Sequence, residues 1–206
     1  GGVVSSTATA VSMAERTRAA PDLYHVTAFS AVIAAVVMFP RALVEVAVVD
    51  PELFPFVAVP LGAMTVAGVL IGALVYWRTE AGHDVETDLK NPFHLRTALI
   101  FGAIFGAVLL LSEYANAWLG VSGIYGTAFV SGLADVDAIT LSLSTLSADG
   151  EISKTVATTG IVIAAIANTA VKAGITWVLG TRELGRLVTA ILGTVAVLGI
   201  AVLLFL

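Results

Sequence analysis

The sequence Ser-Gly-Leu-Ala-Asp-Val-Asp-Ala-Ile-Thr-Leu-Ser-Leu-Ser, residues 131–144, places two carboxylates and four hydroxyls inside an otherwise apolar stretch. Similar apolar stretches recur along the whole chain, in which 58% of the residues are hydrophobic and 12% are charged. An Asp at the centre of a membrane-spanning helix costs roughly 2.5–3.5 kcal/mol, so two of them need partners, water, a bound ion or a proton. We therefore expect the chemistry of this chain at Asp135 and Asp137.

The length of the apolar stretches predicts an all-α fold, a polytopic bundle of transmembrane helices. Each long stretch has about 20–27 residues, enough to cross a hydrocarbon core of about 30 Å. The strands of an outer-membrane barrel would instead alternate apolar and polar residues over about 10 positions. Six full spans are expected near residues 26–49, 56–77, 95–118, 121–147, 155–179 and 187–206, and a truncated span at 1–14. The lipid bilayer is thus the expected environment, and nucleic acid is not an expected partner.

The chain resembles itself at an offset of 130 residues. Two blocks agree at this offset: Gly2, Ala8 and Ser12 align with Gly132, Ala138 and Ser142, and Val32-Ile33-Ala34-Ala35 aligns with Val162-Ile163-Ala164-Ala165. Because four expected spans separate the copies, we predict a parallel repeat, with both copies in the same orientation. The predicted organisation is a first repeat at 1–78, an acidic cytoplasmic loop at 79–94, a central span at 95–120 and a second repeat at 121–206.

The positions of Lys and Arg predict the orientation in the membrane. If successive loops alternate between the two sides, one side carries Arg16, Arg18, Arg78, Lys90, Arg96 and Lys154, and the other carries Arg182 and Arg186. Basic residues accumulate on the cytoplasmic side of membrane proteins. We therefore expect a multi-pass protein of the cell membrane with a cytoplasmic C-terminus.

The two Asp residues fall on different faces of a regular helix, about 200° apart. Asp135 shares its face with Ser142, and Asp137 shares its face with Thr140. Neither face suits lipid, so this helix either lies in the centre of the bundle or is unwound near Gly132, where both carboxylates converge on one site. In the alternative, the Asp side chains pair across helices and only stabilise the packing.

Charged and polar residues on other spans are the candidate partners. Asn168 and Lys172 are four residues apart and share a helix face. The Lys172 side chain either reaches Asp135 or Asp137 or extends to the membrane interface. Arg41 is expected to be neutralised by Glu45, four residues further on, and Pro40 is expected to kink that span.

Motifs of soluble enzyme and metal sites are absent from the sequence. It has no Cys, its three His residues are scattered, and it has no Walker A loop, dinucleotide fingerprint, nucleophile elbow or His-Glu-x-x-His motif. We therefore expect a protein that is not an enzyme and has no organic cofactor. Asp135 and Asp137 are the candidate metal ligands, because hard cations prefer oxygen.

Four strings of sequence carry a resemblance to a known family. They are Gly1-Gly2-Val3-Val4-Ser5-Ser6-Thr7-Ala8-Thr9, Asn91-Pro92-Phe93, Ser131-Gly132-Leu133-Ala134-Asp135-Val136-Asp137-Ala138-Ile139-Thr140 and Ala167-Asn168-Thr169-Ala170-Val171-Lys172-Ala173-Gly174. Together they resemble the C-terminal domain of MgtC/SapB-type membrane proteins, domain-of-unknown-function family 4010. The resemblance covers essentially the whole chain but implies no settled activity. It also implies an upstream membrane module in the same protein as a partner, and a second copy of the chain is the other partner considered.

These observations lead to two functional hypotheses. In the first, the protein is a transporter or channel-like permease for a small cation of unknown identity, and Asp135 and Asp137 bind the ion or carry protons. Supplementary oxygens would come from Ser5, Thr7, Thr140 and Ser142, and the partner residues would be Asn168 and Lys172. In the second, the protein is a non-transporting membrane regulator or assembly subunit whose polar centre is structural.

Overall fold

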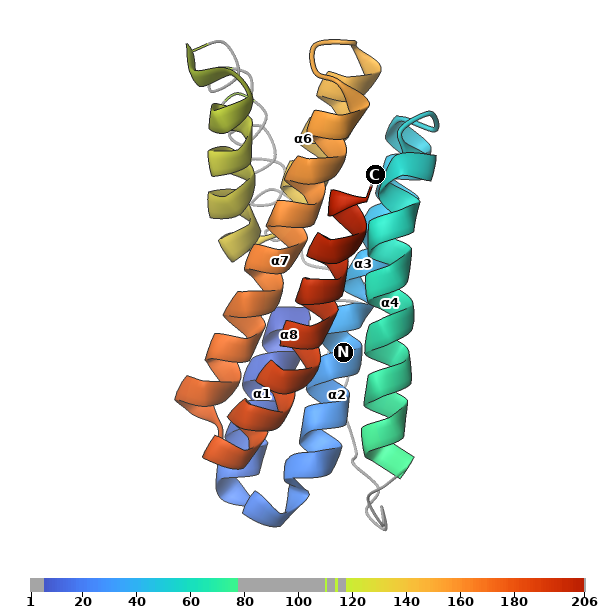
Figure 1. The fold of residues 1–206 in the computed structure, drawn as a ribbon. Coiled ribbons are helices and arrows are strands. Elements are labelled where there is room, and N and C mark those ends of the chain that lie inside the picture. Colours follow the sequence, from blue (N-terminus) through green and yellow to red (C-terminus); the bar gives the residue numbers. More distant parts are fainter. Residues whose placement is uncertain (1–5, 78–109, 111–113, 115–117, 206) are drawn as a thin grey trace. The chain divides into compact units, whose positions relative to one another are not determined.

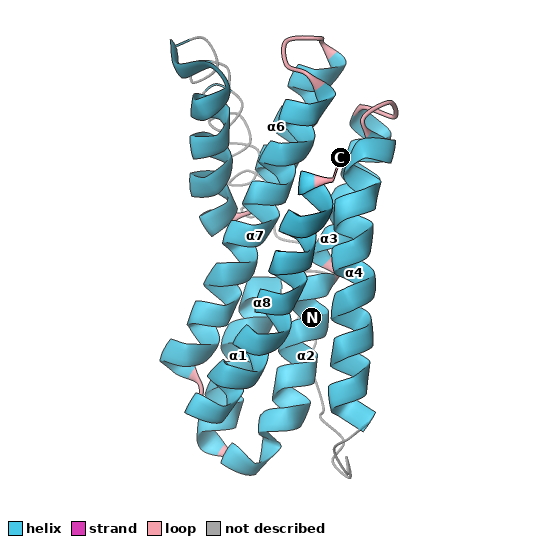
Figure 2. Cartoon of the chain, in the orientation of Figure 1, coloured by secondary structure: helices cyan, strands magenta, loops and turns pink. Residues whose placement is uncertain are grey.

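The computed structural model describes residues 6–77, 110, 114 and 118–205. In this part of the chain all regular elements are helices (Figures 1 and 2). The labelled elements are α1 (Ser6–Ala19), the 3-10 helix η1 (Pro21–Leu23), α2 (Tyr24–Val36), α3 (Met38–Val49), α4 (Phe54–Trp77), α6 (Asp137–Ala148), α7 (Lys154–Leu179) and α8 (Arg182–Leu204). A further apolar helix, Trp118–Ala134, precedes α6.

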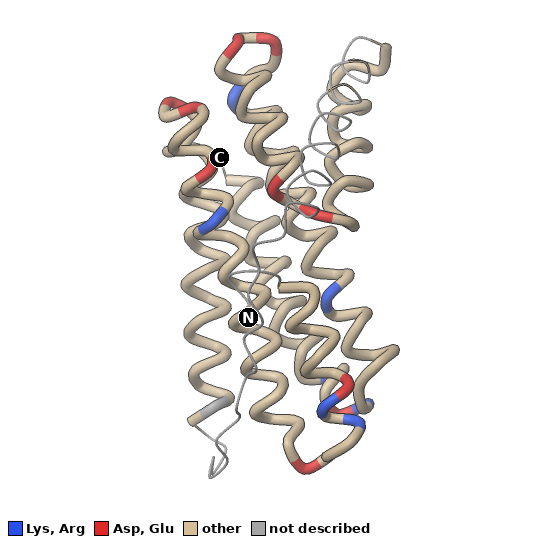
Figure 3. Tube along the Cα trace, turned by 180° about the vertical axis from the view of Figure 1, so that it is seen from behind, with Lys and Arg blue, Asp and Glu red and all other residues tan. Residues whose placement is uncertain are grey.

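The described chain has 4 helices that are long and apolar enough to cross a membrane. They are Pro21–Val49, which contains η1, α2 and α3, then Phe54–Val75, Lys154–Leu179 and Arg182–Leu204. Charged residues lie mostly in loops and at helix ends (Figure 3). The expected all-helical class is confirmed, and these helices are typical of a membrane protein. The expected span at 95–118 lies almost wholly outside the described residues.

The chain divides into two compact units. Unit 1 consists of Gly1–Met38, Met64–Asn91 and Thr169–Leu198, and unit 2 consists of Phe39–Ala63, Pro92–Asn168 and Gly199–Leu206. The helices α4, α7 and α8 each contribute residues to both units.

In unit 1, α1 and α2 pair through the short connection η1. The hydroxyls of Thr17 and Thr27 form a buried hydrogen bond of 2.5 Å between the two helices. On its other side α2 contacts α4 very closely, since a Cβ atom on Gly68 would lie 2.3 Å from Cγ2 of Val36. Gly68 therefore allows α2 and α4 to approach each other closely.

The C-terminal ends of α1 and α7 lie together in unit 1. The Arg18 guanidinium donates a hydrogen bond of 3.3 Å to the carbonyl oxygen of Val178. Arg182 follows a few residues later, at the start of α8. The alternating assignment of loops expects Arg16 and Arg18 on the opposite side from Arg182 and Arg186, whereas Arg18 here lies close to the loop that leads to Arg182.

In unit 2, the region predicted as one span at 121–147 is two helices. The helix Trp118–Ala134 ends before Asp135, and α6 starts at Asp137, so the helical path is interrupted at Asp135 and Val136. This agrees with the prediction that the segment is unwound near Gly132.

The two helices form a hairpin beside α7. A Cβ atom on Gly132 would lie 2.4 Å from the carbonyl oxygen of Ala164, and one on Gly160 would lie 3.8 Å from Ala128 Cβ. The helix Trp118–Ala134 therefore runs in the same direction as α7. Because α6 returns to the start of α7 through a short loop, α6 runs in the opposite direction (Figure 1).

Local sequence explains where two elements end. Pro40 lacks an N–H group, and its ring clashes with the carbonyl of the residue four positions earlier, Val36. The helix is interrupted at Val37, between α2 and α3, as the kink predicted from Pro40 requires. At the other end of the hairpin, α6 gives way to a turn at Gly150, whose φ of 77° suits glycine.

Candidate functional site

The bend of the hairpin lies beside the middle of α7. Gly132 contacts Ala164, which is ten residues after Lys154 and thus about 15 Å along the helix axis. A hydrocarbon core is about 30 Å thick, so the bend is at the depth of a bilayer midplane if α7 spans the membrane. Unwound backbone at that depth occurs in proteins only where other groups satisfy it.

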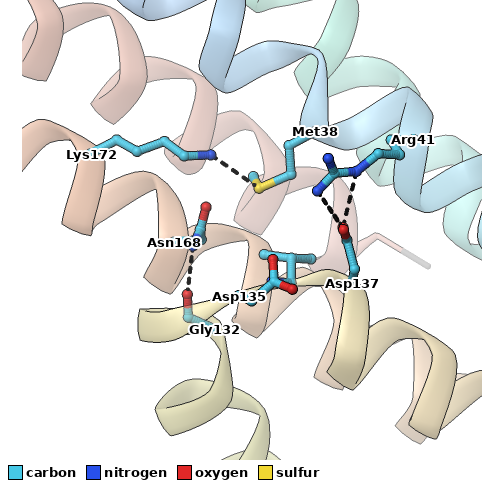
Figure 4. Close-up of polar contacts among 8 residues, drawn as sticks. Met38, Arg41, Gly132, Asp135, Asp137, Asn168 and Lys172 are labelled. Carbon is cyan, nitrogen blue, oxygen red and sulfur yellow. Dashed lines mark hydrogen bonds and ion pairs between the residues drawn. The ribbon is translucent and has the colours of Figure 1, made fainter. Parts of the chain in front are cut away.

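Two side chains satisfy backbone groups that the interruption frees. The Asn168 amide donates a hydrogen bond of 2.9 Å to the carbonyl oxygen of Gly132, near the end of the first helix. One carboxylate oxygen of Asp135 accepts the N–H of Val136 at 2.9 Å, just before α6 begins. Figure 4 shows both residues at the bend. Asn168 and Asp135 therefore stabilise the interrupted geometry.

Asp137, the first residue of α6, forms an ion pair with Arg41 of α3. The Arg41 Nε and Nη2 atoms donate to Oδ1 of Asp137 at 3.1 and 2.6 Å, and Nη2 lies 2.5 Å from Oδ2 (Figure 4). The exposed fractions of the two side chains are 32% and 16%. The sequence analysis, which considered only Glu45 as the partner of Arg41, missed this pair.

Glu45 is a third carboxylate at this site. It lies within electrostatic range of Arg41, Asp135 and Asp137. Its Oε2 atom is buried, and no described residue forms a hydrogen bond with that atom. If all four side chains are ionised, three negative charges and one positive charge give a net charge of −2.

The four hydroxyls predicted as supplementary oxygens lie in different parts of the chain. Thr140 and Ser142 of α6 are fully buried, and neither hydroxyl has a hydrogen-bond partner in the described part of the chain. Thr7 lies on α1, in unit 1, and Ser5 lies outside the described residues. Within the described ranges, no group of three or more His, Cys, Asp or Glu side chains is arranged to hold a metal ion.

Lys172 is buried in unit 1, with an exposed fraction of 1%. Its ammonium donates a hydrogen bond of 3.3 Å to the sulfur of Met38 (Figure 4). The side chain therefore does not extend to a membrane interface, which was one of the two outcomes expected. The pairing of Lys172 with Asp135 or Asp137 stays a prediction.

Asp50, which the sequence did not single out, also has a defined role in unit 2. Asp50 is 5% exposed, and its Oδ1 atom accepts the N–H groups of Glu52 and Leu53, each at 3.1 Å. Its Oδ2 atom accepts the hydroxyl of Ser147, near the end of α6, at 2.7 Å. An Asp whose carboxylate can accept the N–H groups two and three residues further on is a common turn and capping signal, so the local part of this role was detectable.

A comparison with protein families identifies the chain. The family described as "Domain of unknown function (DUF4010)" matches residues 1–180. The chain belongs to the DUF4010 family. The match confirms the resemblance to domain-of-unknown-function family 4010 that was seen in the sequence.

One relative within known sequences is an "Uncharacterized protein" of Aquifex aeolicus (strain VF5). It is 31% identical over 186 residues, which are 89% of this chain and 81% of that protein. No solved structure matches the chain. The DUF4010 family and this relative carry no printed activity, so the functional argument depends on the site itself.

Proposed function

We propose that this DUF4010 protein is a transporter or channel-like permease for a small cation, protons included, with its binding site at the hairpin bend. The observation that carries the proposal is the set of three carboxylates, Glu45, Asp135 and Asp137, around one Arg41. Interrupted helices that meet at the midplane are the usual location of ion sites in transporters. A net charge of −2 on these four side chains would attract a cation or a proton.

Each residue of the bend has a proposed role. Asp135 and Asp137 bind the ion or carry the proton, and Glu45 joins them as a third acid. Arg41 holds Asp137 in position and lowers the charge that the ion must balance. Thr140 and Ser142 remain proposed oxygen donors, and the roles of Ser5 and Thr7 stay predictions from the sequence. Asn168 stabilises the interrupted backbone at the bend by donating a hydrogen bond to the carbonyl oxygen of Gly132.

We also propose that the internal repeat is inverted. At the offset of 130 residues, α1 corresponds to α6, Pro21–Val49 to α7 and Phe54–Val75 to α8. In support, α1 ends beside the end of α7, whereas α6 ends beside the start of α7. The parallel repeat was predicted because residues 121–147 were counted as one crossing of the membrane. A hairpin enters and leaves on the same side, so it does not count as a crossing. Inverted repeats are common among secondary transporters.

A further contact supports the inverted repeat. In unit 2, Ser147 of α6 meets Asp50 at the end of α3. At the same offset, Ser147 corresponds to Thr17 and Asp50 corresponds to Gly180. Both of these residues lie in unit 1. There the equivalent helix ends also meet, since a Cβ atom on Gly180 would lie 3.6 Å from Cα of Ala14.

The orientation proposed from these ends differs from the one expected from the sequence. Four arginines lie near one end of α7: Arg16 and Arg18 in the last turn of α1, and Arg182 and Arg186 at the start of α8. Arg18 contacts Val178 there. The opposite end of α7 begins with Lys154. By the positive-inside rule, the arginine end is cytoplasmic. Because α8 starts there and is long enough to cross the membrane, the C-terminus then lies outside the cytoplasm.

The competing function is a non-transporting regulator or assembly subunit. It is favoured by the same hydrogen bonds, because Arg41–Asp137 and Asn168–Gly132 join separate helices and stabilise packing without any ion. The link to MgtC/SapB-type proteins remains a resemblance and supports neither function over the other.

Thermal stability of the purified protein across Na⁺, K⁺, Mg²⁺, Ca²⁺, Mn²⁺ and pH separates the two functions. A ligand at 100 times its Kd stabilises the folded state by about 2.7 kcal/mol, a readily visible shift of the melting temperature. We expect one ion, or acid pH, to stabilise the wild type and to have no such effect on Asp135→Asn/Asp137→Asn. The matched control is Asp149→Asn, which removes an exposed carboxylate from unit 2.

The outcomes are distinct. An ion-dependent shift that is lost in the double variant and kept in the control supports the ion site and justifies flux measurements in liposomes. Equal melting curves in every ion and pH, with a double variant that is only less stable, would support the packing role.

A further inference from the structure

A row of polar side chains runs along one face of α6 from the bend to the end of the helix. Asp137, Thr140, Ser144 and Ser147 follow one another at steps of three, four and three residues. This spacing keeps all four within one stripe of a helix. The row begins at the ion pair with Arg41 and ends at the hydrogen bond between Ser147 and Asp50.

The two hydroxyls in the middle of the row are buried without partners. Thr140 and Ser144 are 0% exposed, and neither side-chain oxygen has a hydrogen-bond partner in the described part of the chain. Thr145, on a different face of α6, instead donates to the carbonyl oxygen of Leu141 at 2.9 Å. That is the usual way for a helical hydroxyl to satisfy itself in apolar surroundings.

Buried hydroxyls that have no protein partner are normally hydrogen-bonded to water. Steps of three or four residues separate the side chains by about 4.5–6 Å along the axis, too far for a direct hydrogen bond. One water between two hydroxyls, with two bonds of about 2.8 Å, matches that separation. The spacing along α6 therefore suits alternating hydroxyls and single waters.

We propose that a file of waters along Thr140, Ser144 and Ser147 connects Asp137 to Asp50 and conducts protons. The inference rests on the proposed function and narrows it to the proton. A proton enters the file at one carboxylate, each water or hydroxyl accepts one proton as it passes its own to the next, and a proton leaves at the other carboxylate. No other reactant is consumed.

The two ends of the row suit this role. At the bend, Asp137 is paired with Arg41 and lies close to Glu45 and Asp135. At the other end, Asp50 lies two residues before Glu52, whose side chain is 83% exposed and forms an ion pair with Lys154. The exposed Glu52 places the end of the row within reach of bulk water.

Substituted cysteines test the water file without depending on transport. The chain has no Cys, so Thr140→Cys and Ser144→Cys each introduce one thiol. Ag⁺ is small enough to enter a file of single waters and reacts with thiols there. The control is Leu143→Cys, which is also 0% exposed and sits at the same depth but outside the row. The measured quantity is the fraction of thiol that remains after Ag⁺ treatment of the folded, purified protein.

We expect Ag⁺ to consume the thiols at 140 and 144 much faster than the thiol at 143. Equal, slow reaction at all three positions would overturn the water file, whatever the transport assays show. Rapid reaction at 140 and 144 together with no proton flux in wild-type liposomes would keep the water file but overturn proton conduction along it. Transport of another cation is decided separately, by the ion-dependent melting shift and by flux of that ion.

Where the wild type conducts protons, Thr140→Val and Ser144→Ala test the conduction step. Each removes a hydroxyl and leaves a side chain of similar volume. Proton flux, read with a dye trapped in the liposomes, is expected to fall roughly tenfold, whereas Thr145→Val is expected to leave it unchanged. Unchanged flux in both row variants would show that protons take another path.

Discussion

Arg41 is the single side chain that most affects the geometry of the hairpin bend. It binds both oxygens of Asp137, the residue at which α6 starts. The pair is only partly exposed, so its attraction is screened less than that of a surface pair. Removing either member leaves a charge in surroundings that do not solvate it well.

A double-mutant cycle tests this at the residue scale. We expect Arg41→Gln and Asp137→Asn each to destabilise the protein by about 1–3 kcal/mol, between the values for surface and buried pairs. The double variant should lose less than the sum of the two, because neither partner is then left charged. Thermal unfolding in detergent provides the measurement.

The control cycle uses Glu52→Gln and Lys154→Gln, which removes an exposed ion pair of the same unit. Its coupling energy is expected to be at most about 1 kcal/mol. A coupling between Arg41 and Asp137 no larger than this control would mean that the pair is not important for stability.

Sequence reasoning found the acids of the site but not their arrangement. Asp135 and Asp137 are conspicuous because a carboxylate is costly in an apolar stretch. Glu45 was assigned to Arg41 because residues four apart are neighbours on a helix. The true contact joins residues 96 positions apart, and no local pattern encodes such a distance.

At the scale of elements, the hairpin depends on the close approach of Gly132 to α7. Its nearest neighbours are backbone atoms of Ala164, at 2.4 to 2.9 Å from a Cβ atom placed on Gly132. Backbone atoms cannot turn aside as a flexible side chain can, so any residue with a Cβ atom must push the helices apart.

Gly132→Ala is therefore expected to destabilise the protein by about 1–3 kcal/mol, by overpacking against α7. The matched control is Gly126→Ala on the same helix, because a Cβ atom there would have nothing within 4 Å. Since Ala has the higher helix propensity, the control should be neutral or slightly stabilising. Equal melting temperatures for the two variants would contradict the close contact.

The length of an apolar stretch does not distinguish a crossing from a hairpin. Residues 121–147 are long enough to span a membrane, and so they were predicted as one helix. The signal of the interruption was the pair of carboxylates on opposite helix faces, which gave unwinding near Gly132 as one of two alternatives. It could not predict the reversal of direction, which arises from contacts with Gly160 and Ala164 of α7.

At the scale of the whole molecule, one hairpin counted as a crossing changes every later assignment. Counting 121–147 as a span put Lys154 on the side of Arg16 and gave a parallel repeat with a cytoplasmic C-terminus. The contact between Arg18 and Val178, four residues before Arg182, favours the opposite arrangement proposed above. Orientation predicted from sequence is therefore only as good as the count of crossings.

The proposed orientation predicts the location of the C-terminus. A periplasmic alkaline phosphatase fused after Leu206 is expected to be active, and a fluorescent protein that matures only in the cytoplasm is expected to stay dark. The control is the same pair of fusions made after Gly180, next to the arginine end, with the opposite result expected. A fluorescent C-terminal fusion would restore the orientation first expected from the sequence.

The hairpin at Trp118–Ala148 also has a consequence for how the protein is made. Both of its ends face the same side of the membrane under the proposed topology, so the translocon cannot release it as two ordinary spans. Its polar bend depends on Arg41, made earlier, and on Asn168, made later. The bend can therefore form completely only after α7 has been synthesised. The proposed site is thus among the last parts of the molecule to be completed during biogenesis.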